Sequence, residues 1–522
     1  MTSAADRVGA GLQPARPARP IRAAERIHVV GAAGAGASAA ALLALHAGAT
    51  VSGCDPGGSS PYTPALEALG IEIAPEHAAA HVTSGRRPDR LAVTKALTAI
   101  DPDQPELVAA RLAGIPLEPW QQVVADAAFG RTLVGVAGTH GKSTTSGWLV
   151  HLLVAAGADP SAFVGALLPA AITGGPPATA RWGRGDAFVV EADEYAGNFD
   201  AYRPGVVVLT SLEWDHPDVF ADLEAVSTSF ERWIRATAED ERWPVLVANV
   251  GDPNVAALVH RLRVDWPGNL VLTAVVDAAP QRLDGYARGL AGEFEGVEPA
   301  HVVLGRVVRT EPDGTTVELS GRTLVGEPLT LKVPTAGRHN VANALGAFGA
   351  ARALDVPADV AAAGLATFPG IGRRLERKGE AAGVVVYDDY GHHPTAIRET
   401  IAAVRQREPG RRIWAVYEPL TFHRTAAMLA QFSDVLSAAD AVAIADVWAG
   451  RDPDTTIVSA ADLAAAIAVR RPGLPVIAPG SVEATADALA REVRPGDVVL
   501  VMGGGASYRI GERLLVRLEE DR

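Results

Sequence analysis

The chain has 522 residues, 48% of them hydrophobic, and a formal net charge of −14 at pH 7. This length exceeds what one hydrophobic core usually supports, so we expect about three domains, and the acidic balance argues against nucleic acid or an anionic membrane as a partner. The single cysteine, Cys54, excludes an intramolecular disulfide and fits the reducing cytoplasm.

The first predicted elements form a Rossmann-like opening. Residues 1–25 lack an apolar run of signal-peptide length and are expected to be a disordered tail. Residues 27–30 are predicted to be a strand, 38–46 a helix and 50–53 a second strand that ends at Asp55. Strand, turn, helix and strand in this order indicate a βαβ unit.

The turn in this unit is rich in glycine. Gly31, Gly34 and Gly36 follow the order G-x-x-G-x-G, which differs from the usual dinucleotide spacing. The turn therefore either binds a nucleotide or only permits close packing of helix and strand. Residues 29–54 contain no Asp, Glu, Lys or Arg, so a membrane span must be considered. Their five glycines favour a buried βαβ unit instead.

A phosphate-binding loop follows the apolar run 133–137. Glycines let backbone N–H groups approach phosphate oxygens, Lys142 adds a mobile positive charge, and the Ser143 hydroxyl can ligate Mg²⁺. The loop is a short variant, because Val136 stands where the usual pattern has glycine, but a lysine here is notable in a chain with four lysines and 43 arginines. The predicted nucleotide contacts are Gly138, Thr139, His140, Gly141, Lys142, Ser143 and Thr144.

Two acidic segments follow apolar strands of the same unit. Residues 188–190 lead into Glu191 and Asp193, and residues 206–209 lead into a segment that ends at His216. Ligands bind at the carboxyl ends of strands in open α/β sheets, and carboxylates suit Mg²⁺. His216 is a softer donor that could serve a structural hydrogen bond instead, and the acidic run alone could be a solvated strand end or a helix cap.

The last third of the chain again alternates strands and helices. Residues 384–387 are predicted to be a strand that leads into a polar loop, 388–394, and later strands are expected at 413–416, 442–445 and 498–501. The loop contains Asp and His, but we expect it to face a ligand rather than to bind Zn²⁺. Before this unit, Asn340 and Asn343 lie three residues apart on one predicted helix face, where they could cap the helix or contact a base.

Together these segments resemble the Mur ligase family, the ATP-dependent enzymes that add amino acids to a UDP-muramyl precursor of peptidoglycan. The resemblance spans nearly the whole chain after residue 26. The segments that carry it are residues 31–36, 52–55, 138–145, 191–194, 215–216, 337–343, 370–374, 389–395 and 502–505.

The resemblance implies an α/β fold with three domains and assigns a ligand to each. Residues 26–128 would be a Rossmann-like domain that binds the UDP-sugar, 129–371 a central P-loop domain that binds ATP, and 372–522 a Rossmann-like domain for the amino acid. In this scheme Gly31, Gly34, Gly36 and Asp55 contact the UDP-sugar, and Asn340, Asn343, Arg374 and Asp389 contact ATP. Lys142, Glu191 and His216 are catalytic, Ser143, Glu191 and His216 hold Mg²⁺, and Tyr390, His392 and Arg424 bind the amino acid.

The implied reaction is ATP-dependent ligation of L-alanine to the carboxylate of UDP-N-acetylmuramate through an acyl phosphate. The protein would be cytoplasmic, a monomer or weak homodimer, with no nucleic acid or membrane partner. Glu418, Leu420 and Trp120 depart from the pattern expected for L-alanine addition. A preformed peptide, L-alanyl-γ-D-glutamyl-meso-diaminopimelate, is the alternative acceptor within the family. Remoter alternatives are an NAD-dependent oxidoreductase and a nucleotide-binding scaffold without catalysis.

Overall fold

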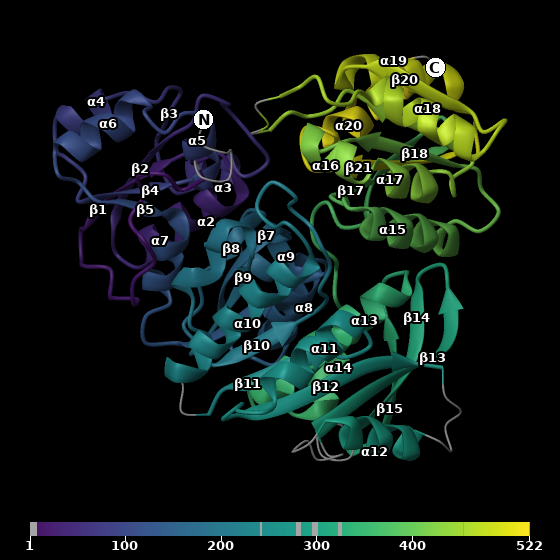
Figure 1. Cartoon of the computed structure of the whole chain (residues 1–522), viewed down its shortest axis with the longest axis horizontal. Helices are drawn as coiled ribbons and strands as arrows, with labels where there is room; N and C mark the ends of the chain where they lie inside the picture. Colours follow the sequence, from purple (N-terminus) through teal and green to yellow (C-terminus); the bar gives the residue numbers. More distant parts are fainter. Residues whose placement is uncertain are drawn as a thin grey trace.

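Three α/β units lie around a common centre in the computed structural model (Figure 1). The predicted fold class is confirmed. The structure describes residues 8–240, 243–277, 283–294, 301–321, 326–450, 452 and 454–520.

The N-terminal unit is a five-stranded parallel sheet in the order β3-β2-β1-β4-β5. Strands β1, β4 and β5 are almost entirely buried, whereas β3 and the start of β2 are partly exposed, and helices pack on both faces of the sheet. The strands are β1 (Arg26–Val30), β2 (Thr50–Cys54), β3 (Ile73–Ala74), β4 (Arg90–Val93) and β5 (Leu117–Pro119). The helices are α2 (Ala35–His46), α3 (Thr63–Ala68), α4 (Ala80–Thr83), α5 (Lys95–Ile100), α6 (Pro105–Leu112) and α7 (Trp120–Ala127).

The central unit contains a ten-stranded sheet in the order β15-β14-β13-β12-β11-β10-β6-β9-β7-β8. The pairs from β13 to β7 are parallel, and β8, β14 and β15 pair antiparallel at the two ends. The strands are β6 (Thr132–Ala137), β7 (Ser161–Leu168), β8 (Ala178–Arg181), β9 (Ala187–Ala192), β10 (Val206–Leu209), β11 (Val245–Asn249), β12 (Asn269–Val276), β13 (Val302–Glu311), β14 (Gly314–Gly321) and β15 (Gly326–Val333). The helices are α8 (Lys142–Ala155), α9 (Ala170–Thr173), η1 (Tyr195–Ala201), α10 (Leu223–Asp240), α11 (Pro253–Leu262), α12 (Leu283–Glu293), α13 (Arg338–Ala353) and α14 (Ala358–Ala366).

The C-terminal unit is a six-stranded sheet in the order β16-β17-β21-β18-β19-β20, in which only β16 pairs antiparallel among the described residues. Its strands are β16 (Glu376–Ala381), β17 (Val384–Asp389), β18 (Ile413–Glu418), β19 (Ala441–Ala445), β20 (Val476–Gly480) and β21 (Val498–Gly503). Its helices are α15 (Pro394–Arg407), α16 (Phe422–Ala427), α17 (Leu429–Leu436), α18 (Ala460–Arg470), α19 (Val482–Glu492) and α20 (Tyr508–Glu520).

The strands predicted from apolar runs are present in all three units, and the helix expected at 38–46 begins three residues earlier, at Ala35. It starts directly after Gly34, so the glycine turn is shorter than expected. The domain boundaries at 128/129 and 371/372 stay predictions; each falls between one sheet and the next. No helix among the residues that the structure describes has both the length and the apolar composition needed to cross a membrane.

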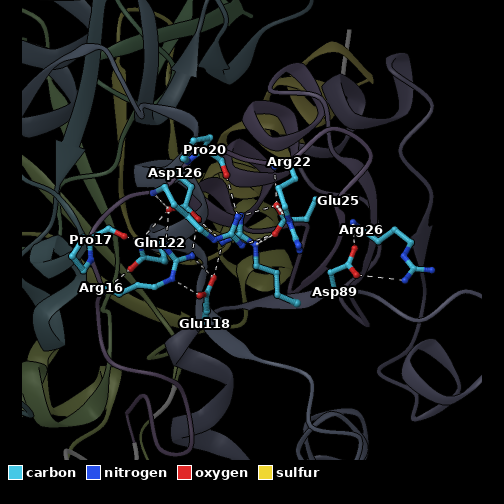
Figure 2. Close-up of polar contacts among 12 residues, drawn as sticks. Arg16, Pro17, Pro20, Arg22, Glu25, Arg26, Asp89, Glu118, Gln122 and Asp126 are labelled. Atoms are coloured by element: carbon cyan, nitrogen blue, oxygen red, sulfur yellow. Dashed lines mark hydrogen bonds and ion pairs between the residues drawn. The ribbon is translucent and has the colours of Figure 1, made fainter.

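The structure differs from the expected tail at residues 8–25, which lie against the N-terminal unit (Figure 2). Arg16 forms ion pairs with Glu118 at 2.8 Å and with Asp126 at 2.7 Å, and Arg19 pairs with Glu25 at 2.6 Å. The three acidic partners, Glu25, Glu118 and Asp126, are nearly inaccessible to solvent. The arginines therefore offset negative charges that would be costly to bury alone. The composition of the tail predicted disorder, because it does not reveal that Glu118 and Asp126, both distant in sequence, form ion pairs with Arg16.

The two outer units contact the central unit in different ways. Helix α2 packs its small side chains against β7 and β8, and the apolar core is continuous across this contact. The C-terminal unit meets the central unit chiefly through polar groups. Gln406 on α15 donates to the Glu311 carbonyl at 2.9 Å, and Thr395 donates to Glu213 at 2.8 Å. The N-terminal contact therefore resembles a domain core, and the C-terminal contact resembles a separable interface.

Candidate active site

A cleft of about 1360 Å³ lies between the three units, and each unit contributes side chains to its wall. The N-terminal unit contributes Gly36, Tyr62 and Trp120. The central unit contributes the phosphate loop, the acidic segments after β9 and β10, and the start of α13. The C-terminal unit contributes Arg374, Asp389, Tyr390, His392, Leu420 and Trp448. Most residues predicted for the site therefore face one cavity.

The phosphate loop follows strand β6, as predicted, and leads into α8. Gly138 and Gly141 have φ angles of 133° and 81°, which residues with a side chain rarely adopt. A Cβ atom on Gly141 would also overlap the amide of Asn343. The His140 N–H donates to Ser211 Oγ at 2.8 Å and fixes the loop on the neighbouring segment. The loop and the start of α8 together form a site suited to an anion.

Lys142 is held inside this loop by oxygen acceptors. Its Nζ donates to the Gly138 carbonyl at 2.6 Å and to Glu194 Oε2 at 3.0 Å. Burial alone would lower the pKa of Lys142, but Glu194, Asp193 and Glu191 outweigh it and raise that pKa. Lys142 is therefore a positive charge at the mouth of an anion site.

The acidic segment after β9 divides into two neighbouring groups. In the first, Ser143 Oγ donates to Glu191 Oε1 at 3.0 Å, while the Gly165 N–H donates to the other carboxylate oxygen at 2.6 Å. In the second, ligand atoms of Asp193, Glu194 and His216 all lie within 4.8 Å of one another. The three predicted Mg²⁺ ligands are thus divided between the groups, with Ser143 and Glu191 in one and His216 in the other.

Burial sets the protonation of the second group. Burial raises the pKa of Glu194 to about 7, although Lys142 acts in the opposite direction. The pKa of Asp193 is lowered, because Lys142 and His216 more than offset its burial. Asn198 also donates to Asp193 at 2.8 Å. Two adjacent carboxyl groups with opposite pKa shifts can hold either a proton or a cation at neutral pH.

Arg424, predicted to bind the amino acid, contacts two residues of the central unit. It forms a buried ion pair with Asp215 at 2.7 Å and lies 3.2 Å from Nδ1 of His216. The pKa of Asp215 lies well below its usual range, because Arg424 and His216 offset its burial. His392 is nearby, and burial lowers the pKa of its imidazole. Arg424 therefore joins the central unit to the C-terminal unit beside the predicted amino-acid site.

Three of the predicted ATP contacts, Asn340, Asn343 and Asp389, lie on α13 and β17. Asn343 Nδ2 donates to Asn340 Oδ1 at 3.3 Å, and Asn340 Nδ2 donates to the Ala336 carbonyl at 2.7 Å. Asp389 accepts from the Leu375 N–H at 2.8 Å and from the Gly391 N–H at 2.7 Å. These hydrogen bonds fix the orientation of all three side chains.

Arg374 crosses from the C-terminal unit to the phosphate loop. Its Nη2 donates to Ser143 Oγ at 2.8 Å, and its guanidinium lies 5.1 Å from the centre of the Tyr390 ring. A guanidinium at this point could bind phosphate oxygens in place of the hydroxyl. The C-terminal unit thus adds a positive charge beside the loop.

The glycine turn of the N-terminal unit is shaped by Asp55 and Trp120. Gly31 has a φ angle of 83°, and the Asp55 carboxylate accepts from the Ala33 N–H at 3.0 Å. The Trp120 indole lies so close to Gly36 that a Cβ atom there would overlap the ring. Trp120, at a position that departs from the family pattern, therefore covers the start of α2.

Several aromatic residues that line the cleft could not be predicted from the sequence. Tyr62, Trp448 and Tyr508 come from loops or the start of a helix in two different units. Leu420 lies beside Gly504, and Gly505 lies against Trp448 and Glu418. No local pattern marks single aromatic residues of this kind, so only the tertiary structure identifies them.

A chain that encloses a phosphate loop and a partly buried lysine between three α/β units is an enzyme of the nucleotide-dependent class. Three family models match it in order. They are the Mur ligase family catalytic domain over residues 26–131, the Mur ligase middle domain over 136–351, and the Mur ligase glutamate ligase domain over 373–505. The chain belongs to the Mur ligase family.

Individual relatives agree with this assignment. The UDP-N-acetylmuramate–L-alanine ligase of Frankia casuarinae is 37% identical over 499 residues, covering 91% of this chain and 94% of the relative. The fold is similar to that of the UDP-N-acetylmuramate-alanine ligase of Thermotoga maritima, with a TM-score of 0.73, 21% identity, and coverage of 95% and 100%. It is also similar to a murein peptide ligase of Psychrobacter arcticus, with a TM-score of 0.69, 23% identity, and coverage of 95% and 98%.

Proposed function

We propose that the protein joins L-alanine to the carboxylate of UDP-N-acetylmuramate and converts ATP to ADP and phosphate. The observation that carries this proposal is the partly buried Lys142, whose loop opens onto a cleft shared by all three units. Relatives 36–37% identical over 91% of the chain are UDP-N-acetylmuramate–L-alanine ligases, which supports the choice of substrates.

Each unit has its own ligand in this proposal. The N-terminal glycine turn, with Gly31, Gly34, Gly36 and Asp55, holds the UDP-sugar. The phosphate loop, Asn340, Asn343, Arg374 and Asp389 hold ATP. Tyr390 and His392 lie beside the amino acid, and Arg424 positions His216 through its contact with Nδ1. The ligands meet in the cleft because its wall is made by all three units.

The donors beside the loop suit Mg²⁺, which prefers hard oxygen ligands. Ser143 and Glu191 would hold one ion, and Asp193 and Glu194 offer a second position close by. Bound there, Mg²⁺ would neutralise charge on the phosphate oxygens. His216 contacts the second position and is the weaker candidate ligand.

The reaction proceeds in two displacements. A carboxylate oxygen of the muramyl group attacks the γ-phosphorus of ATP, the bond to the β-γ bridging oxygen breaks, and ADP leaves. The neutral amine of L-alanine then attacks the carbonyl carbon, and the tetrahedral intermediate loses a proton and expels phosphate. Lys142 and Arg374 stabilise negative charge on the transferred group, so no protein nucleophile is required.

The second candidate acceptor is the tripeptide L-alanyl-γ-D-glutamyl-meso-diaminopimelate. It is favoured by the departures at Glu418 and Leu420, which place a buried carboxyl and an aliphatic side chain beside the predicted amino-acid site. Burial raises the pKa of Glu418 to about 7, which reduces its charge at neutral pH. A partly protonated Glu418 and the aliphatic Leu420 together lower the polarity of this pocket.

Phosphate release with each acceptor distinguishes these candidates. The full chain is supplied with ATP, Mg²⁺, UDP-N-acetylmuramate and either L-alanine or the tripeptide, and the product is weighed by mass spectrometry. We expect L-alanine to give the higher kcat/KM, and turnover with the tripeptide alone would overturn the proposal. Lys142→Ala should lower kcat/KM by about 10²-fold or more, whereas the matched Lys332→Ala, with a partly exposed side chain on the edge strand β15, should not.

Two further properties belong to the proposal. We propose that the protein acts in the cytoplasm, which is supported by a single cysteine that is buried and free, as is usual in a reducing compartment. The cleft is built from one chain, so a monomer or a weak homodimer is sufficient for activity.

A further inference from the structure

A separate cluster of ionisable side chains lies inside the N-terminal unit, away from the cleft, and none of its members lines the cleft wall. It consists of His28 on β1, Cys54 at the end of β2, His81 on α4 and Glu106 in the first turn of α6, here called the N-terminal cluster. Their ligand atoms all lie within 4.8 Å of one another. Cys54 and Glu106 are fully buried, and 4% of His28 is exposed.

The pairwise distances converge on one point. Cys54 Sγ lies 3.4 Å from His28 Nε2 and 3.2 Å from Glu106 Oε2. Glu106 Oε1 lies 2.9 Å from His28 Nε2 and 3.1 Å from His81 Nδ1. With Zn–N and Zn–S bonds of about 2.0 and 2.3 Å, the ligand atoms of a zinc tetrahedron lie about 3.2–3.6 Å apart. The cluster thus has nearly the dimensions of a zinc site before any ion is bound.

The charges of the cluster also match a divalent ion. A thiolate and a carboxylate together carry two negative charges, and two neutral imidazoles carry none, so one Zn²⁺ gives a site of zero net charge. Neutrality matters because an unpaired charge is costly in a buried site. The mixture of thiolate, imidazole and carboxylate suits zinc better than Mg²⁺ or Ca²⁺, which prefer oxygen donors alone.

Surrounding groups orient these side chains. His28 Nδ1 is 2.8 Å from Ser52 Oγ, so its other ring nitrogen faces Cys54 and Glu106. Hydrogen bonds of this kind fix the ring of a metal-binding histidine. His77 Nδ1 lies 3.1 Å from Cys54 Sγ, where it could donate to a thiolate. The four members come from regular elements rather than from one loop, which makes the site rigid.

We propose that the N-terminal cluster binds one Zn²⁺ ion that ties the end of β2 to α4 and α6. In the metal-free protein the Cys54 thiol donates to Glu106, and metal binding would replace that proton. The Cys54 carbonyl accepts from the Gly31 N–H at 2.9 Å, and the next residue, Asp55, holds the glycine turn. The ion would therefore stabilise the turn; its effect on UDP-sugar binding rests on the proposed function, whereas metal binding itself does not.

Metal content is the direct test. The full chain without an affinity tag is dialysed against metal-free buffer with one equivalent of Zn²⁺, and bound zinc is counted by mass spectrometry. We expect one zinc per chain, loss of zinc in Cys54→Ser and His81→Gln, and full retention in the matched His151→Gln, which lies on α8 in the central unit. Lys142→Ala should also retain zinc while losing ligation, which separates this proposal from the proposed function.

Cobalt supplies a second readout that needs no destabilised variant. Co²⁺ in the unaltered protein should give the visible bands of a tetrahedral site and a thiolate charge-transfer band, which Zn²⁺ should displace. Removal of zinc by a chelator should lower the temperature of unfolding of the unaltered protein. Failure to take up either metal, or uptake unchanged by Cys54→Ser and His81→Gln, would show that the cluster is only a hydrogen-bond network.

Discussion

At the scale of single residues, burial gives carboxyl groups beside the phosphate loop unlike protonation states. Glu194 keeps its proton up to a pH of about 7, whereas the pKa of Asp193 is lowered by Lys142 and His216. The Glu194 proton thus removes one negative charge from the surroundings of Lys142. Binding of a cation would displace the Glu194 proton, so we expect metal affinity to rise with pH through neutrality.

This protonation has a consequence for stability. The pKa of Glu194 in the folded protein, about 7, exceeds its ordinary value of 4.5. The contribution of its protonation to the free energy of unfolding is therefore fully present below pH 4.5 and is lost as the pH rises through 7. Glu194→Gln should flatten that decline, by at most about 3 kcal/mol, in urea unfolding measured from pH 5 to 8. Glu224→Gln, at an exposed position on α10, is the matched control. A decline that is the same in both variants would contradict this protonation state.

The phosphate loop could be predicted because its information is local. Strand, glycines, Lys142 and Ser143 are consecutive, and the acidic segments follow strands that pair with β6. The division of the ligands into two groups could not be predicted, because it depends on which oxygen each side chain presents. The N-terminal cluster was also missed: it joins residues 28, 54, 81 and 106, whose spacing matches no metal-binding pattern.

At the scale of elements, the turn between β1 and α2 is shaped by a residue far along the chain. Trp120, the first residue of α7, rests on Gly36 and also contacts Phe163 on β7, with ring centres 5.1 Å apart. The glycine is therefore required for the approach of the indole as well as for the turn. Sequence alone placed Gly36 in a nucleotide turn but gave no reason for Trp120.

Gly36→Ala should displace the Trp120 ring and distort the proposed UDP-sugar site. Overpacking of this kind costs about 1–3 kcal/mol, which corresponds to roughly a 5- to 150-fold weaker affinity. We expect the KM for UDP-N-acetylmuramate to rise while the KM for ATP stays unchanged. Gly289→Ala on α12, where a Cβ meets no neighbour, is the control for substitution in a helix. An unchanged KM for the UDP-sugar would rule out this role of the turn.

At the scale of the whole molecule, the unequal interfaces indicate which unit moves. The N-terminal unit shares an apolar core with the central unit, whereas polar pairs such as Arg424–Asp215 and Thr395–Glu213 join the C-terminal unit. Polar contacts can exchange with water at a smaller cost than an apolar core. Opening of the cleft is therefore expected to displace the C-terminal unit, and its closure brings Arg374 to the phosphate loop.

Arg424→Gln tests this closure. It leaves Asp215 buried without its ion-pair partner, a loss of about 3–5 kcal/mol that opening of the cleft would relieve. We expect a larger radius of gyration in small-angle X-ray scattering and a lower kcat. Arg470→Gln, which breaks an exposed pair within the C-terminal unit, should change neither. Unchanged scattering by the Arg424 variant would indicate that the pair does not control closure.

The most direct test of the reaction follows a single atom. UDP-N-acetylmuramate labelled with ¹⁸O in its carboxylate is converted with ATP and L-alanine, and the phosphate released is analysed by mass spectrometry. Activation of that carboxylate by the γ-phosphate predicts that each phosphate carries one labelled oxygen, because the bond to the carbonyl carbon breaks in the second step. Phosphate without label, with the amide formed all the same, would contradict the account.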